Sequence, residues 1–77
     1  MIKKVLINPQ PKVKRVPGGC GWDINGVPCF MGTAEGHIRN DQRFKPPLEE
    51  CNGSYDNLKE SWVEKNENGE YVWVLVL

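Results

Sequence analysis

The chain closes on the segment YVWVLVL, residues 71–77, and this stretch decides the fold. Successive side chains of an extended strand point to opposite faces, so three valines share one face. The other face carries Tyr71, Trp73, Leu75 and Leu77. Both faces are apolar, which predicts a strand that is buried on both sides. One thin sheet cannot easily cover both, so we expect barrel closure, a covering helix or a second copy, and these four residues are candidate self-association residues.

A hairpin is predicted immediately before this strand. Asn66-Glu67-Asn68-Gly69 is a strong turn sequence between two β-rich segments. A two-residue turn would set two glutamates opposite each other, and like charges in that position are destabilising. A four-residue loop instead sets Lys65 opposite Glu70 and Trp62 opposite Trp73. The charge pair and the aromatic pair favour the four-residue loop, so we expect both tryptophans to share one face in the core.

The segment before the hairpin allows two structures. Ser54 is a suitable helix N-cap, and apolar residues after it fall on one helical face. We predict a short helical turn near residues 55–60 and then the hairpin, with a continuous helix to residue 66 as the alternative. Leu48 to Cys51 is expected to form a further helical turn, because a proline precedes it and Gly53 follows it.

The N-terminal half predicts short strands separated by loops rich in glycine and proline. Lys3 to Ile7 is β-rich, and Lys12 to Val16 suits a sheet edge, where lysines discourage unwanted pairing. Trp22 to Met31 predicts a hairpin around Asn25-Gly26, a preferred type I′ turn sequence. Pro28 lacks an N–H group, so the second arm of this hairpin is expected at an edge.

Together these segments predict an α+β fold with mainly antiparallel strands. We expect a small single domain, residues 1–77, of four or five short strands with one or two short helices. A weak strand is expected around His37–Arg39, and a small β-barrel is the alternative architecture. A core of this size rarely supplies more than about 3–5 kcal/mol of stability. Little of that is left for strained catalytic machinery, so we expect the chain to act through its surface.

The charges balance in number but are divided along the chain. Residues 1–45 carry eight basic and three acidic side chains, a net of +5, and residues 46–77 carry two and seven, a net of −5. The two halves either intersperse their charges on one surface or form a dipolar molecule that steers a charged partner. No apolar run approaches the roughly 20 residues of a membrane span, and no secretory signal is recognised. We therefore expect a soluble, cytoplasmic protein.

The sequence contains no clear constellation for catalysis or for a cofactor. A zinc site would combine the three cysteines with His37, but no two cysteines have the close spacing that begins such sites. Glycines around a cysteine indicate a tight bend more often than a thiol nucleophile, and the glycines of 18–21 lack the phosphate-binding patterns. We expect reduced thiols, no metal, no cofactor and no enzymatic activity. The cysteines are Cys20, Cys29 and Cys51.

Aromatic and arginine side chains supply the candidate binding residues. Three tryptophans in 77 residues is a high proportion, and Trp, Tyr and Arg anchor many protein interfaces. We predict Trp22, beside the glycine loop, as an exposed anchor with Arg39 and Arg43 as flanking contacts. In the alternative, a β-barrel that binds single-stranded nucleic acid, Trp22, Phe30 and Phe44 would stack on bases beside a basic groove. That groove would draw on Lys12, Lys14, Arg15, Arg39, Arg43 and Lys45.

The leading hypothesis is a small non-catalytic protein that attaches to a larger protein and modulates or inhibits it. It is expected to form a homo-oligomer through the closing strand, and no membrane partner is expected. Small chains without catalytic constellations are often viral or mobile-element inhibitors of host proteins, so a host–virus interaction is a hypothesis from size alone. Nucleic acid is the alternative partner.

Overall fold

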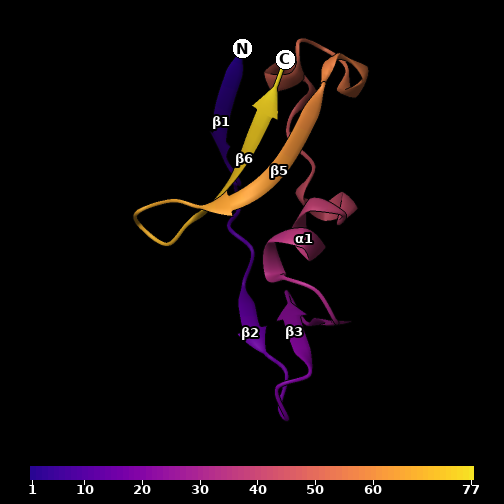
Figure 1. Cartoon of the computed structure of the whole chain (residues 1–77), viewed down its shortest axis with the longest axis vertical. Helices are drawn as coiled ribbons and strands as arrows, with labels where there is room; N and C mark the ends of the chain where they lie inside the picture. The colour runs from indigo at the N-terminus through magenta and orange to yellow at the C-terminus, as the bar shows by residue number, and fades with distance from the viewer.

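Two antiparallel three-stranded sheets form the fold in the computed structural model, which describes all 77 residues (Figure 1). The upper sheet has the order β1-β6-β5, with β1 at Ile2–Leu6, β6 at Tyr71–Val76 and β5 at Glu60–Lys65. The lower sheet has the order β2-β3-β4, with β2 at Val13–Arg15, β3 at Gly21–Ile24 and β4 at Val27–Phe30. The predicted α+β, mainly antiparallel class is confirmed, with six strands rather than four or five. The β-barrel alternative is wrong, because the two sheets remain separate.

Along the chain, the helices lie between the β3–β4 hairpin of the lower sheet and the β5–β6 hairpin of the upper sheet. They are α1 at Ala34–Arg39 and three 3-10 helices, η1 at Gln42–Phe44, η2 at Leu48–Cys51 and η3 at Tyr55–Asn57. Helix α1 packs against β5 of the upper sheet and β3 of the lower sheet. Figure 1 shows the sheets one above the other along the longest axis, with α1 beside their junction. The molecule measures 41 × 25 × 18 Å, so its two ends present separate surfaces.

Strand β6 is the centre of the upper sheet, and its inner face forms the core. Tyr71, Trp73 and Leu75 are buried together with Ile38 of α1 and Phe44 of η1. The Nε1–H group of Trp73 donates to the Phe44 carbonyl oxygen at 2.6 Å. The proposed self-association face therefore needs correction, because the chain's own helices cover these three β6 side chains. Leu77 at the end of the chain is half-buried.

The outer face of β6 is covered by side chains of the two flanking strands. Val72 and Val74 are buried, although no helix crosses this face. Lys4 of β1 lies opposite Val74, and Glu64 of β5 lies opposite Val72. The Lys4 Nζ atom and the Glu64 Oε1 atom form an ion pair at 3.0 Å that bridges the central strand. Burial of β6 on both faces, as predicted, is confirmed, and the chain supplies both covers itself.

The predicted pairing of the C-terminal hairpin is wrong by one residue. The loop has three residues, 67–69, and the Asn66 N–H donates to the Glu70 carbonyl oxygen at 2.8 Å. The Asn66 side-chain oxygen also accepts from the backbone N–H groups of Asn68 and Glu70, which closes a tighter turn with Gly69 at φ +77°. A one-residue shift moves every side chain to the other face.

This shift separates the two tryptophans. Val63 lies opposite Trp73 on the inner face, and Trp62 lies opposite Val74 on the outer face. Trp62 is consequently 37% exposed and is not part of the core. Lys65 lies opposite Tyr71 instead of Glu70, with its Nζ atom 5.3 Å from the centre of the tyrosine ring.

Most of the other local predictions are confirmed, and one alternative is wrong. The helical turns at Leu48–Cys51 and near residues 55–60 are confirmed, and the continuous helix to residue 66 is wrong because β5 begins at Glu60. The first hairpin is confirmed with positive φ at both residues of Asn25-Gly26, and β4, which contains Pro28, lies at a sheet edge. The N-terminal strand and the edge strand of residues 12–16 are confirmed within one residue at each end.

The expected strand at His37–Arg39 is wrong, since these residues end helix α1. The Thr33 hydroxyl oxygen accepts from the Gly36 N–H at 3.0 Å and caps the start of the helix. Ala34 and Ile38 are four residues apart and are both buried, so one face of this short helix packs on the core. Packing of that face decides the structure of a segment in which two glycines make the helical pattern weak.

Gln10 extends the pairing of the upper sheet beyond β1. Its side-chain amide donates to the Tyr71 carbonyl oxygen at 2.8 Å and accepts from the Tyr71 N–H at 2.7 Å. The same amide nitrogen donates to the Ile7 carbonyl oxygen at 2.6 Å. The side chain thus supplements the backbone hydrogen bond from the Ile7 N–H to the Tyr71 carbonyl oxygen, and it fixes the chain where it leaves the upper sheet for the lower one.

Candidate functional site

The predicted binding residues are distributed over the molecule. Phe44 is buried in the core, and Arg43 is bound to groups of its own chain. The Arg39 Nε–H group donates to the Ser61 carbonyl oxygen at 2.7 Å, at the outer edge of β5. Trp22 and Phe30 both belong to the lower sheet, but Trp22 lies opposite Cys29 while Phe30 lies opposite Gly21. Their side chains therefore point to opposite faces of that sheet.

Trp22 supports a turn instead of standing free as an anchor. Its indole ring is half-buried, and the guanidinium of Arg15 lies 4.7 Å from the ring centre. Its Nε1–H group donates to the Gly32 carbonyl oxygen at 3.4 Å. The ring thus joins β2 to the turn that follows β4. Met31, the residue before Gly32, is more exposed than Trp22.

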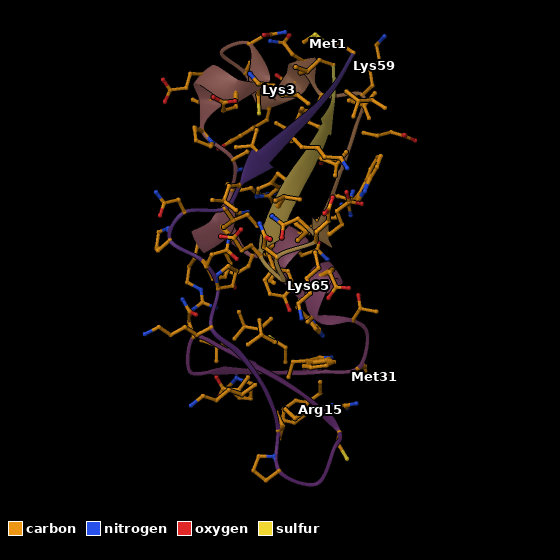
Figure 2. All side chains as sticks on the ribbon, turned by 90° about the vertical axis from the view of Figure 1, so that its left-hand side faces the viewer. Met1, Lys3, Arg15, Met31, Lys59 and Lys65 are labelled. Atoms are coloured by element: carbon orange, nitrogen blue, oxygen red, sulfur yellow. The ribbon has the colours of Figure 1, made fainter.

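That residue, Met31, is the most exposed large hydrophobic side chain of the chain. It is 83% exposed, and Phe30 beside it is 59% exposed. We call these two residues the Phe30–Met31 ridge. Figure 2 places Met31 and Arg15 at the end of the molecule opposite Met1. Met31 is not among the binding residues that the sequence predicts, and the only local signal for it is the glycine that follows.

The backbone of Met31 is held in an unfavourable conformation. Its φ of +68° is in the left-handed region, which costs a residue with a side chain roughly 1–2 kcal/mol. The Nε2 atom of His37 hydrogen-bonds to the Met31 carbonyl oxygen, and Trp22 bonds to the next carbonyl. Two side chains from α1 and β3 therefore fix the turn that presents the ridge to solvent.

The basic side chains form separate groups and do not line one groove. Arg39, Lys45 and Lys59 surround a shallow depression beside Tyr55 on the upper part of the molecule. Lys12 and Lys14 surround another depression near the Asn25-Gly26 turn. Of the three proposed stacking residues, Phe44 is buried and the other two point to opposite faces. This arrangement gives the nucleic-acid hypothesis little support.

A second apolar surface lies on the outer face of the upper sheet. Ile2 and Leu6 of β1 are 65% and 49% exposed, and Trp62 of β5 shares their face. The Lys4–Glu64 ion pair crosses the middle of this face. Donation from Lys4 holds the pKa of Glu64 below its ordinary value.

The cysteines are free and lie apart in the fold. Cys20 is exposed in the glycine loop, Cys29 is half-buried in β4, and Cys51 is buried in the core. Burial raises the pKa of the Cys51 thiol. No three His, Cys, Asp or Glu side chains converge in a way that could hold a metal ion.

Asp41 and Arg43 connect η1 to strand β3 of the lower sheet. The Arg43 Nη2 atom donates to Asp41 Oδ2 at 2.7 Å and to the carbonyl oxygen of Ile24 in β3 at 3.1 Å. Asp41 also accepts the backbone N–H of Arg43 at 2.9 Å and thereby caps η1. These hydrogen bonds from Arg43 hold the pKa of Asp41 below its ordinary value.

This pair predicts a specific loss of stability in acid. Because the pKa of Asp41 is lower in the folded than in the unfolded chain, its contribution is complete above the unfolded value of about 4 and is lost as pH falls through the folded value. In urea unfolding at pH 7 down to pH 2, Asp41→Asn should flatten the decline of unfolding free energy at the acid end. Arg43→Gln should flatten it similarly, with Glu64 supplying the remaining slope. A decline as steep as that of the original chain in both variants would contradict this role.

Comparison of the chain with protein-family models, with curated proteins and with solved structures gave no match.

Helix α1 is six residues long, and no helix of this structure has the length and apolar character required to cross a membrane.

Proposed function

We propose that this chain is a small non-catalytic binding protein that attaches to a larger protein and modulates it through the Phe30–Met31 ridge. The observation that carries the proposal is the combination of strain and exposure at Met31. A strained residue persists only where its surroundings hold it, and such residues gather at functional sites. Methionine and phenylalanine are also enriched where proteins bind one another.

The ridge does little for the stability of the isolated chain. With 83% of its surface exposed, the Met31 side chain gains little from burial, while its left-handed backbone lowers stability. Glycine would adopt this φ without strain. Contact with a partner gives the methionine a role that folding alone does not, because the partner would bury both ridge side chains.

Met31→Gly tests this proposal by separating stability from binding. We expect the unfolding free energy to rise by about 0.5–1 kcal/mol, since strain is removed and only an exposed side chain is lost. In affinity capture from the cells that produce the chain, followed by quantitative mass spectrometry, the main captured protein should fall about tenfold.

Val27→Thr is the matched control. Val27 is also an exposed apolar residue of β4, and threonine keeps its shape while lowering its hydrophobicity. This variant should capture the same protein as the original chain. Equal capture by Met31→Gly and the original chain would refute the ridge as the binding site. Capture of nucleic acid with a steep salt dependence would instead support the alternative partner.

A further inference from the structure

The outer edge of β1 is an open strand edge. The Ile7 N–H donates to the Tyr71 carbonyl oxygen at 3.2 Å, and the Leu77 N–H donates to the Met1 carbonyl oxygen at 2.8 Å. Hydrogen-bonded positions alternate along an antiparallel strand, so the odd-numbered residues of β1 bond to β6. The backbone groups of Ile2, Lys4 and Leu6 therefore point away from the sheet. No helix or strand lies beyond β1 in Figure 1, and Figure 2 views this side directly.

The other three sheet edges each carry a feature that hinders pairing. At β5, Arg39 bonds to the Ser61 carbonyl oxygen and α1 packs against the strand. At β4, Pro28 removes one N–H group. Strand β2 has only three residues, and Lys12 and Lys14 stand at its edge. Short length, proline and lysine are common protections of edge strands.

Strand β1 lacks comparable protection. It has five residues and no proline, and both its lysines form ion pairs with acidic residues of the chain. Lys3 pairs with Glu50 at 2.9 Å, and Lys4 pairs with Glu64 at 3.0 Å. An edge with unpaired backbone groups, no proline and lysines held in ion pairs is a template for one more strand.

We propose that this edge accepts an extended segment of a partner protein as an additional antiparallel strand. Backbone hydrogen bonds would supply affinity, and alternate side chains would supply specificity. Ile2 and Leu6 are exposed on the outer face with Lys4 between them, so the segment carries apolar residues opposite these two and an acidic residue opposite Lys4. This site does not depend on the Phe30–Met31 ridge, which lies on the other sheet.

Charge favours a different protein over a second copy of this chain. Two copies that pair symmetrically along β1 can match Ile2 with Leu6, but the two Lys4 side chains then lie directly opposite each other. Like charges in that position are destabilising, whereas an acidic residue would be attracted. Lys4 retains 65% exposure in its pair with Glu64, so its ammonium group remains accessible to a second carboxylate.

The test uses the peptide acetyl-TVTETVT-amide with the full ¹⁵N-labelled chain. Addition of the peptide should slow amide hydrogen exchange at Lys4 and Leu6 about tenfold, with the resonances of the ridge unchanged. The control acetyl-TVTKTVT-amide, with lysine in place of glutamate, should bind several-fold more weakly. Lys4→Pro should abolish the effect because it removes an outward N–H without breaking the ladder to β6, whereas Lys4→Gln should only weaken it.

Three results would overturn the proposal. One is the absence of protection at Lys4 and Leu6 at millimolar peptide, a second is equal binding of the two peptides, and a third is protection that rises with protein concentration alone. The last result would identify a second copy as the occupant. If Lys4→Pro does not fold, the protection pattern and peptide preference of the original chain still decide. Met31→Gly should bind the peptide normally, so failure here and failure of the ridge are distinguishable.

Discussion

Replacing Trp73 by alanine is expected to lower the free energy of unfolding by about 3–5 kcal/mol. Trp73 is 2% exposed, and it packs in the core with Leu75 and Phe44. The substitution removes a large buried ring and also leaves the Phe44 carbonyl oxygen without its 2.6 Å donor. Because a domain of this size has about 3–5 kcal/mol in total, the variant should be largely unfolded at 25 °C.

Trp62→Ala is the matched comparison for Trp73→Ala. It deletes the same side chain one strand away, but from the outer face, where Trp62 is 37% exposed. We expect a loss of about 1 kcal/mol, since only part of the Trp62 ring is buried and the core residues around Trp73 are not affected. Urea unfolding followed by circular dichroism would measure the loss of unfolding free energy in both variants. Equal losses would indicate that the two tryptophans share one face, as the four-residue loop predicts, and would contradict the pairing described here.

The register of this hairpin shows where sequence reasoning stops. The apolar pattern of residues 71–77 and the turn sequence before it predict a hairpin, and both are correct. The choice between two registers depended on side-chain pairs worth only fractions of a kcal/mol. In the structure it is made by the Asn66 side chain, which accepts two backbone N–H groups of the loop. Such a bond depends on a backbone path that pair preferences do not describe.

Residues that restrict the backbone predict local structure more dependably than preferences between paired side chains do. Asn25-Gly26 requires positive φ at two successive residues, and Pro28 lacks a donor, so both positions could be predicted without knowledge of the rest of the chain. Helix α1 could not, because its stability comes from packing Ala34 and Ile38 on strands that are distant in sequence.

The sequence predicts only one of the two ridge residues as a binding residue. Phe30 was identified as a binding candidate from its residue type, and it is exposed at the end of β4. Met31 was not identified, because its left-handed backbone depends on hydrogen bonds from Trp22 and His37 that meet only in the folded chain. Trp22, the preferred anchor, supports this turn, since its indole N–H is directed at Gly32.

Gly21→Ala is expected to lower the free energy of unfolding by about 2–3 kcal/mol and to disturb the ridge through the backbone of β4. Gly21 is buried opposite Phe30, and a Cβ atom there would collide with the carbonyl oxygen of Cys29 and lie 3.1 Å from the Phe30 Cα atom. Both neighbours are backbone atoms of β4, so relief requires β3 and β4 to separate. Capture of the partner should fall together with the protection of the β4 amides from hydrogen exchange.

Gly36→Ala separates this steric effect from the general cost of adding a methyl group. In α1 the added Cβ atom would lie 3.1 Å from the Thr33 hydroxyl oxygen, which is a side-chain atom that rotation can move. Alanine also favours the helix by up to about 1 kcal/mol, which offsets some weakening of the cap. We expect a net change within about 0.5 kcal/mol and normal capture. If Gly21→Ala were equally mild, the close approach of β3 to β4 would not be what positions Phe30 and Met31, and the His37 and Trp22 hydrogen bonds alone would have to hold the ridge.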